Sequence, residues 1–151
     1  MTHFDNNPFE EIEEDVTLLQ KIRIENEHKI EDMASENEKN LDAIFKDLLS
    51  VIDAFNKADT RMAEQYPDNE VAEKVRKRFA TAKKKLFEIL SKNGVTEIEF
   101  PDNMASINDC EIVETEPDLS KPDNTIVNIE KAGFRRNGRL LRLAEVVAVK
   151  N

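Results

Sequence analysis

Apolar residues recur with helical spacing through the first part of the chain. Between Ile12 and Asn40 the steps alternate between four and three residues, which is the spacing of a coiled-coil seam. Several of these positions hold Asn or Arg, so the pattern predicts a long paired helix with weak polar layers; the alternative is a single amphipathic helix on its own core. The seam positions are Ile12, Val16, Leu19, Arg23, Asn26, Ile30, Met33, Asn37 and Asn40.

Local signals predict where this helix begins and where its packing changes. Asn7 suits an N-cap, Pro8 suits the first helical position, and Glu10 stands where the acid of a capping box belongs. After Asn40 the apolar positions shift by one residue, so we expect the helix to break or to change its packing near residues 37 to 41. The stripe beyond this point is broad, which is typical of a helix with several neighbours in a bundle.

A second helix is predicted after the segment "EQYPDNE". Pro67 ends the first helix, and either Asp68 or Asn69 is placed to cap the next one. Lys92, Asn93 and Gly94 end it in the manner of a C-terminal glycine cap. Its apolar face is formed by Val71, Val75, Phe79, Ala82, Leu86 and Ile89.

Beyond Gly94 the pattern changes to short segments rich in β-branched residues, which predicts a small β domain. The pair Asn137 and Gly138 predicts a two-residue hairpin with a type I′ turn, because both central residues of that turn need positive φ. In that register Arg136 faces Arg139 and Phe134 faces Leu141. Like charges opposite each other disfavour the pairing unless solvent or a partner offsets them. The strand-like segments are "VTEIEF", "CEIVETE", "NTIVNI", "AGFRR", "RLLRL" and "EVVAV".

These elements predict an α+β protein with a long N-terminal coiled-coil helix, a helical-bundle dimerisation region and a small C-terminal all-β domain. We place the long paired helix in residues 1–40 and the small β domain in residues 95–151. Residues 41–94 form a two-helix unit, which would contribute half of a four-helix bundle in a dimer.

Charge is distributed unevenly over the 151 residues. The formal net charge is -10, yet residues 131–151 hold six basic residues against one acidic residue. Residues 74–85 hold seven basic residues and no acid, which predicts a solvated helix face or, as the alternative, a surface for an acidic partner.

The sequence carries no arrangement typical of an active site. Its three glycines are far apart and form no phosphate-binding loop, and the two histidines near the N-terminus are distant from Cys110, which we interpret as a small buried hydrophobe. We therefore expect a binding protein and not an enzyme, with no cofactor and no metal. No apolar run approaches the ~20 residues that a membrane-spanning helix needs, so we expect a cytoplasmic protein without a membrane partner.

Four segments in the same order resemble the GrpE family, the nucleotide exchange factors of DnaK-type chaperones. They are the paired long helix, "DLLSVIDAFNKAD" (47–59), "LSKNGVTEI" (90–98) and "IEKAGFRRNGRLLRLAEVVAVKN" (129–151). The resemblance covers roughly residues 41–151. It implies a parallel homodimer with a four-helix bundle, in which one β domain inserts against the ATPase domain of the chaperone and holds its nucleotide cleft open so that ADP leaves.

The resemblance also implies a binding surface and a dimer interface on this chain. For the chaperone contact we expect Arg139 first, then Asn137, Gly138 and Arg142, with Phe134 packing beneath. For dimerisation we expect apolar residues from both parts of the long helix. They are Ile30, Met33, Leu41, Ile44, Phe45, Leu48, Leu49, Ile52 and Phe55.

The chain departs from the family pattern in three places. The segment "IENEHKIE" (24–31) lacks a strongly basic stretch, Arg78 stands near a position where the family often has Gly, and "FPDNMASINDCE" (100–111) replaces a family segment. We expect altered contacts from the helices and an altered linker into the β domain.

Two other functions compete with nucleotide exchange. Nucleic acid could bind to the Lys-rich helix segment 74–85 and to the four arginines of the hairpin, Arg135, Arg136, Arg139 and Arg142. No aromatic ladder accompanies the arginines and the net charge of -10 repels phosphates, so we expect no nucleic-acid partner. A coiled-coil scaffold without exchange activity is the other alternative.

Overall fold

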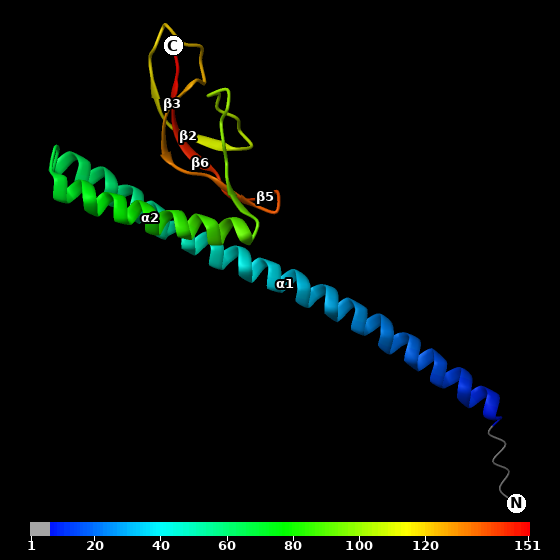
Figure 1. Ribbon diagram of the computed structural model, residues 1–151. Helices are drawn as coiled ribbons and strands as arrows, with labels where there is room; N and C mark the ends of the chain where they lie inside the picture. The colour runs from blue at the N-terminus through cyan, green and yellow to red at the C-terminus, as the bar shows by residue number, and fades with distance from the viewer. Residues whose placement is uncertain (1–6) are drawn as a thin grey trace, which may run out of the picture. The chain divides into compact units, whose positions relative to one another are not determined.

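The computed structural model describes residues 7–151 and has the predicted α+β class (Figure 1). Its elements are α1 (Pro8–Gln65), α2 (Glu70–Lys92), β1 (Val95–Glu97), β2 (Cys110–Glu116), β3 (Ile126–Lys131), β4 (Phe134–Arg136), β5 (Arg139–Arg142) and β6 (Ala144–Val149). The chain divides after Leu41 into two compact units, which we describe separately. No helix within residues 7–151 is long and apolar enough to cross a membrane.

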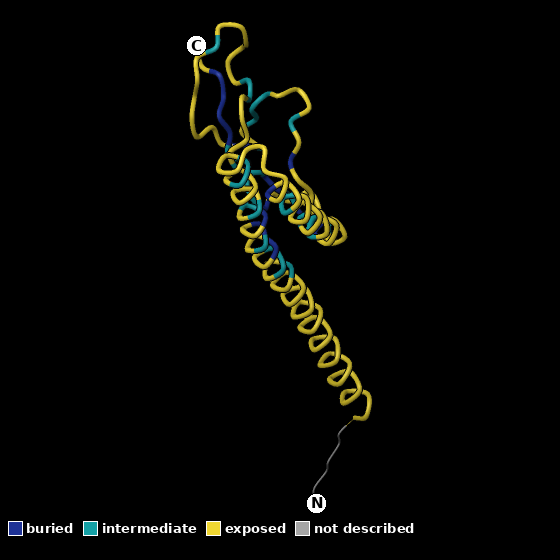
Figure 2. Tube along the Cα trace, turned by 60° about the vertical axis from the view of Figure 1, so that its left-hand side comes forward, coloured by how far each residue is buried: buried dark blue, intermediate teal, exposed yellow. Residues whose placement is uncertain are grey.

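The first unit consists of the N-terminal part of α1. Asn7 caps it as predicted, since its Oδ1 accepts a hydrogen bond from the Phe9 amide at 3.2 Å. Every side chain of this helix from Pro8 to Asn37 is exposed, as the yellow part of the tube in Figure 2 shows. Aliphatic seam residues such as Ile30 and Met33 are therefore uncovered in the single chain.

The helix does not break between residues 37 and 41. That alternative is wrong, because α1 continues to Gln65. The other alternative, a change of packing, is what occurs: Leu41 is half-buried, and Phe45, Leu49 and Ile52 are buried. The helix persists since the shift in apolar phase rotates the buried stripe around α1 without introducing a glycine or proline.

In the second unit α2 lies beside the end of α1. Asn69 is the N-cap, and its Oδ1 accepts hydrogen bonds from the amides of Val71 and Ala72 at 3.0 Å. Asn93 ends the helix, and Gly94 follows with φ of +77°, as the sequence predicts.

Two residues of the basic run on α2 bind α1. Arg76 forms an ion pair with Asp59 at 2.7 Å, and Lys83 Nζ donates to Asn56 Oδ1 at 2.9 Å. Part of this run therefore joins the two helices, whereas the remainder, which includes Lys74, Lys84 and Lys85, is exposed to solvent.

The β residues form two three-stranded sheets, with strand orders β1-β4-β5 and β2-β6-β3. Strand β6 is central in the second sheet, parallel to β2 and antiparallel to β3, and its residues Val146 and Val149 are almost fully buried. Cys110 and Ala144 pack with Val146 in the core, which confirms the interpretation of Cys110 as a small buried hydrophobe.

The β4–β5 hairpin has the predicted turn, with φ of +49° at Asn137 and +79° at Gly138. Arg136 faces Arg139 as predicted. The predicted pairing of Phe134 with Leu141 is wrong: Phe134 lies opposite Arg142, because the register shifts between Phe134 and Arg135. An irregularity of this kind sets an additional residue on one strand, and Leu141 becomes buried.

Candidate functional site

The tip of the β4–β5 hairpin is docked on the end of α2. The amide of Asn137 donates a hydrogen bond to the carbonyl oxygen of Gly94 at 2.9 Å. A Cβ atom at Gly94 would lie only 2.0 Å from Asn137 Oδ1, closer than two such atoms can approach. Glycine at position 94 therefore serves both the helix end and the close approach of the hairpin.

One carboxylate offsets the two like charges that face each other in the hairpin. Asp42 of α1 accepts a hydrogen bond from Arg136 Nη1 at 2.7 Å and from Arg139 Nη2 at 3.0 and 3.2 Å. The hydrogen bond from Arg136 is the main cause that lowers the pKa of the Asp42 carboxyl; partial burial opposes it, and the charge of Arg139 adds to it. The ionised form of Asp42 is thereby favoured.

Arg136 is the one charged side chain that is buried within residues 7–151. Its guanidinium carbon lies 5.0 Å from the ring centroid of Phe45, and its Nε donates to the carbonyl oxygen of Asn93 at 3.2 Å. Together with the ion pair to Asp42, these contacts hold the Arg136 side chain in place.

Arg142 makes a second attachment of the hairpin to α1. Its two terminal nitrogens reach the two oxygens of Asp53 at 2.7 and 2.9 Å, and the side chain also donates to the carbonyl oxygen of Ala132. Only 14% of the Arg142 side-chain surface is exposed. The guanidinium lies 5.6 Å from the ring centroid of Phe134, which is buried against Phe87.

The hairpin thus divides the predicted chaperone-binding residues into two groups. Asn137, Gly138 and Arg139 are exposed at the tip, with 52% of the Arg139 side-chain surface accessible. Phe134 and Arg142 lie beneath and hold the hairpin in place.

All four arginines of the hairpin contact carboxylates of the chain itself. Arg135 pairs with Asp109 at 2.8 Å, Arg136 and Arg139 share Asp42, and Arg142 pairs with Asp53. These three carboxylates offset most of the positive charge of the four guanidinium groups, so the hairpin attracts a phosphate backbone less strongly, which weakens the nucleic-acid alternative.

The predicted dimer residues also fall into two groups. Phe45, Leu49 and Ile52 are buried within the single chain. The other predicted residues are partly or fully exposed: Ile30, Met33, Leu41, Ile44, Leu48 and Phe55.

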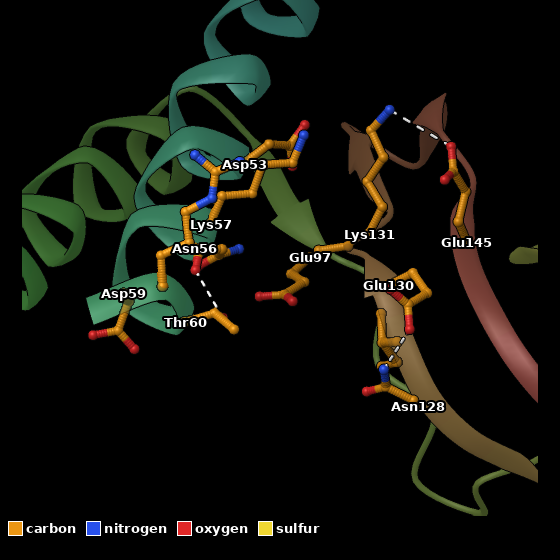
Figure 3. A pocket seen from close by; sticks show the side chains of 13 residues that line it. Asp53, Asn56, Lys57, Asp59, Thr60, Glu97, Asn128, Glu130, Lys131 and Glu145 are labelled. Carbon is orange, nitrogen blue, oxygen red and sulfur yellow. Dashed lines mark hydrogen bonds and ion pairs between the residues drawn. The ribbon is translucent and has the colours of Figure 1, made fainter. Parts of the chain in front are cut away.

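A polar cleft of about 980 Å³ separates the end of α1 from strands β3 and β6 (Figure 3). Lys131 and Glu145 pair across two strands at 3.5 Å, and Asn128 donates to Glu130 at 2.6 Å. Only Ile129 and Ala132 are apolar among its lining residues, whereas sites for small organic ligands have mostly apolar walls. Within residues 7–151 no group of three or more His, Cys, Asp or Glu side chains could hold a metal ion.

Sequence reasoning missed Asp42 and Asp53, which anchor the hairpin. A signal was present, because 11 residues correspond to three helical turns and place both carboxylates on one face of α1. That signal does not identify the partners, which lie 94, 97 and 89 residues away in the chain.

Comparison with known proteins places the chain in a family. The family model described as GrpE matches residues 6–150. Protein GrpE of Francisella tularensis subsp. mediasiatica is 31% identical over 139 residues, and that of subsp. novicida is 32% identical over 142 residues. Both matches cover 91% of this chain and 69% of the relative. The chain therefore belongs to the GrpE family, the co-chaperones that act as nucleotide exchange factors of DnaK-type chaperones.

Proposed function

We propose that this protein is an adenyl-nucleotide exchange factor that binds the ATPase domain of a DnaK-type chaperone in the cytoplasm and promotes the release of ADP. The observation that carries the proposal is the exposed tip of the β4–β5 hairpin. There Asn137, Gly138 and Arg139, which resemble part of the C-terminal signature of the family, lie on a turn that is held by the hydrogen bond from the Asn137 amide to the Gly94 carbonyl oxygen.

Exchange of this kind requires binding and no catalytic side chain. A partner that binds the open state of the nucleotide cleft better than the closed state must weaken ADP binding by the same coupling free energy. Each tenfold loss of ADP affinity needs about 1.4 kcal/mol of preference for the open state. A hairpin with a charged, half-exposed tip can supply such a preference through a few contacts.

In this proposal Asn137, Gly138 and Arg139 touch the chaperone, and Arg139 contributes most. Arg142 and Phe134 support the contact from beneath. Arg142 pairs with Asp53 and Phe134 packs on Phe87, and these contacts fix the position of the hairpin. An arginine suits this role since its planar guanidinium can donate to a carboxylate and to carbonyl oxygens at the same time.

We also propose that the chain acts as a parallel homodimer. Ile30, Met33 and Ile44 expose 66%, 69% and 56% of their surface in the single chain, and Val71 exposes 70%. Apolar residues in rows along helices mark protein contacts, and a second copy would cover them in a coiled coil and a four-helix bundle.

The deciding experiment measures release of labelled ADP from a purified DnaK-type chaperone. We expect the unchanged protein to accelerate release and Arg139→Ala to lower the acceleration about tenfold or more, as for loss of a central arginine in an interface. Lys150→Ala, which also removes one exposed positive charge, is the control and should act like the unchanged protein. No acceleration by the unchanged protein, with a chaperone from the same organism, would reject the proposal.

A further inference from the structure

Asp42 connects a buried arginine with an exposed one. Arg136 is fixed by Phe45, Asn93 and the Asp42 carboxylate, with only 8% of its side-chain surface exposed. The same carboxylate binds Arg139, whose side chain is 52% exposed. Asp42 is therefore a fixed acceptor that reaches from the protein interior to the tip of the hairpin.

A fixed acceptor lowers the entropy that the exposed arginine loses when a partner binds it. A long side chain loses conformational entropy when a partner immobilises it, and this loss weakens binding. Arg139 is already held through Nη2, which bonds to both oxygens of Asp42 at 3.2 and 3.0 Å. Half of its side-chain surface still faces solvent, so a partner can reach it without first breaking these bonds.

We propose that Asp42 is a positioning residue that orders Arg139 in advance for contact with an acidic or carbonyl-rich surface of the chaperone. The inference rests on the proposed function, and it assigns to α1 a part in a contact made by the hairpin. Buried Arg136 takes part in this positioning, because its hydrogen bond prevents the Asp42 carboxylate from turning away from Arg139.

Competition between Asp42 and the chaperone for Arg139 would change the affinity in the opposite direction. If Asp42 mainly competed with the chaperone for Arg139, its removal would strengthen binding. The geometry favours ordering, since Arg139 Nη2 bonds to Asp42 while about half of the Arg139 side-chain surface remains accessible.

The first experiment measures the concentration of this protein that gives half-maximal ADP release from the chaperone. Asp42→Asn keeps the size of the side chain and removes its charge; we expect it to raise that concentration about three- to tenfold, the cost of ordering one long side chain, with little change at saturation. The control Asp59→Asn removes the same charge and another arginine pair of α1, and it should shift the value less than about twofold.

Two further variants separate positioning from general damage. Asp42→Asn in the Arg139→Ala background should cause no further loss, because the ordered group is absent. Asp42→Glu restores a charge for Arg136 and should recover most of the affinity. An equal loss in both backgrounds, or tighter binding by Asp42→Asn, would overturn the inference.

The second experiment needs no chaperone. It measures nitrogen relaxation of the Arg139 Nε–H group in the protein alone. We expect this group to be more mobile in Asp42→Asn than in the unchanged protein. In Asp59→Asn and Asp42→Glu it should be as ordered as in the unchanged protein. If Arg139 is equally ordered in Asp42→Asn, Asp42 does not position it. A protein that shows the ordering but no exchange activity would instead contradict the proposed function.

Discussion

At the scale of single residues, Arg136 shows how a charge becomes acceptable inside a small domain. Transfer of an ion from water into the protein is unfavourable unless its charge and its hydrogen-bonding groups are matched. Asp42 provides the charge, the Asn93 carbonyl accepts from Nε, and Phe45 covers the guanidinium. Removal of the Arg136 side chain should therefore lower the free energy of unfolding more than removal of an exposed arginine of the hairpin.

We expect Arg136→Ala to lower the free energy of unfolding by about 2–4 kcal/mol, because it leaves a cavity and deprives Asp42 of its closest partner. Arg136→Met fills most of the volume and should cost less. Urea unfolding measures both variants. A loss below that of an ordinary surface substitution, about 0.5 kcal/mol, would show that the ion pair does not contribute to stability.

The lowered pKa of Asp42 predicts a dependence of stability on pH. The folded state holds the pKa of this carboxyl below its ordinary value of 3.8, so the ionised form stabilises the fold above that value. This contribution is lost as the pH falls through the folded-state pKa.

The stability difference between the unchanged protein and Asp42→Asn should therefore be constant from pH 7 to about pH 5 and shrink below about pH 4. Urea unfolding at pH 7, 5, 4 and 3 measures it. A difference at pH 3 as large as that at pH 7 would contradict the ionic origin of the contribution.

At the scale of elements, the helix end and the hairpin turn both depend on glycines with positive φ, but for different reasons. Gly94 has φ of +77° and lies against Asn137, whereas Gly138 has φ of +79° and faces open space. The pair therefore separates the cost of the backbone conformation from the cost of a close contact.

We expect Gly138→Ala to lower the free energy of unfolding by about 1–2 kcal/mol, the cost of left-handed backbone for a residue with a Cβ. Gly94→Ala should cost clearly more, because the new methyl group also displaces the hairpin tip. Replacement of Asn137 by Gly in the Gly94→Ala background should recover part of that difference. Urea unfolding measures these variants. If the two alanine variants lose the same free energy of unfolding, the hairpin tip moves away from a methyl group at position 94 without loss of stability.

At the scale of the whole molecule, the unburied apolar rows on α1 and α2 favour a second copy of the chain. Buried residues of α1 such as Leu49 stabilise the single chain, whereas Ile44 exposes 56% of its surface. A charge at an exposed position of the proposed interface should weaken the dimer without unfolding the protomer.

We expect sedimentation velocity to show that the unchanged protein is a dimer. Ile44→Glu should raise the dissociation constant of the dimer tenfold or more, roughly the cost of burying a charge in an apolar interface. Ile107→Glu, at a loop residue that is 89% exposed, is the control and should remain dimeric. A dimeric Ile44→Glu would remove this position from the interface.

The sequence by itself determined the elements whose signals are local. The cap at Asn69, the helix end at Gly94, the type I′ turn at Asn137 and the β-branched strands depend on interactions between residues close together in the chain. Such preferences are readable from spacing and residue type, and the GrpE-family resemblance followed from their order.

Only the tertiary structure decided how the hairpin is held. The sharing of Asp42 by Arg136 and Arg139, the pairing of Arg142 with Asp53 and the register shift that buries Leu141 all depend on packing between distant segments. The continuity of α1 through residues 37–41 was likewise left open by a pattern that fitted either a break or a change of packing. Ion pairs need only opposite charge and proximity, so a chain with 32 acidic and 22 basic residues offers many possible pairings until its fold selects among them.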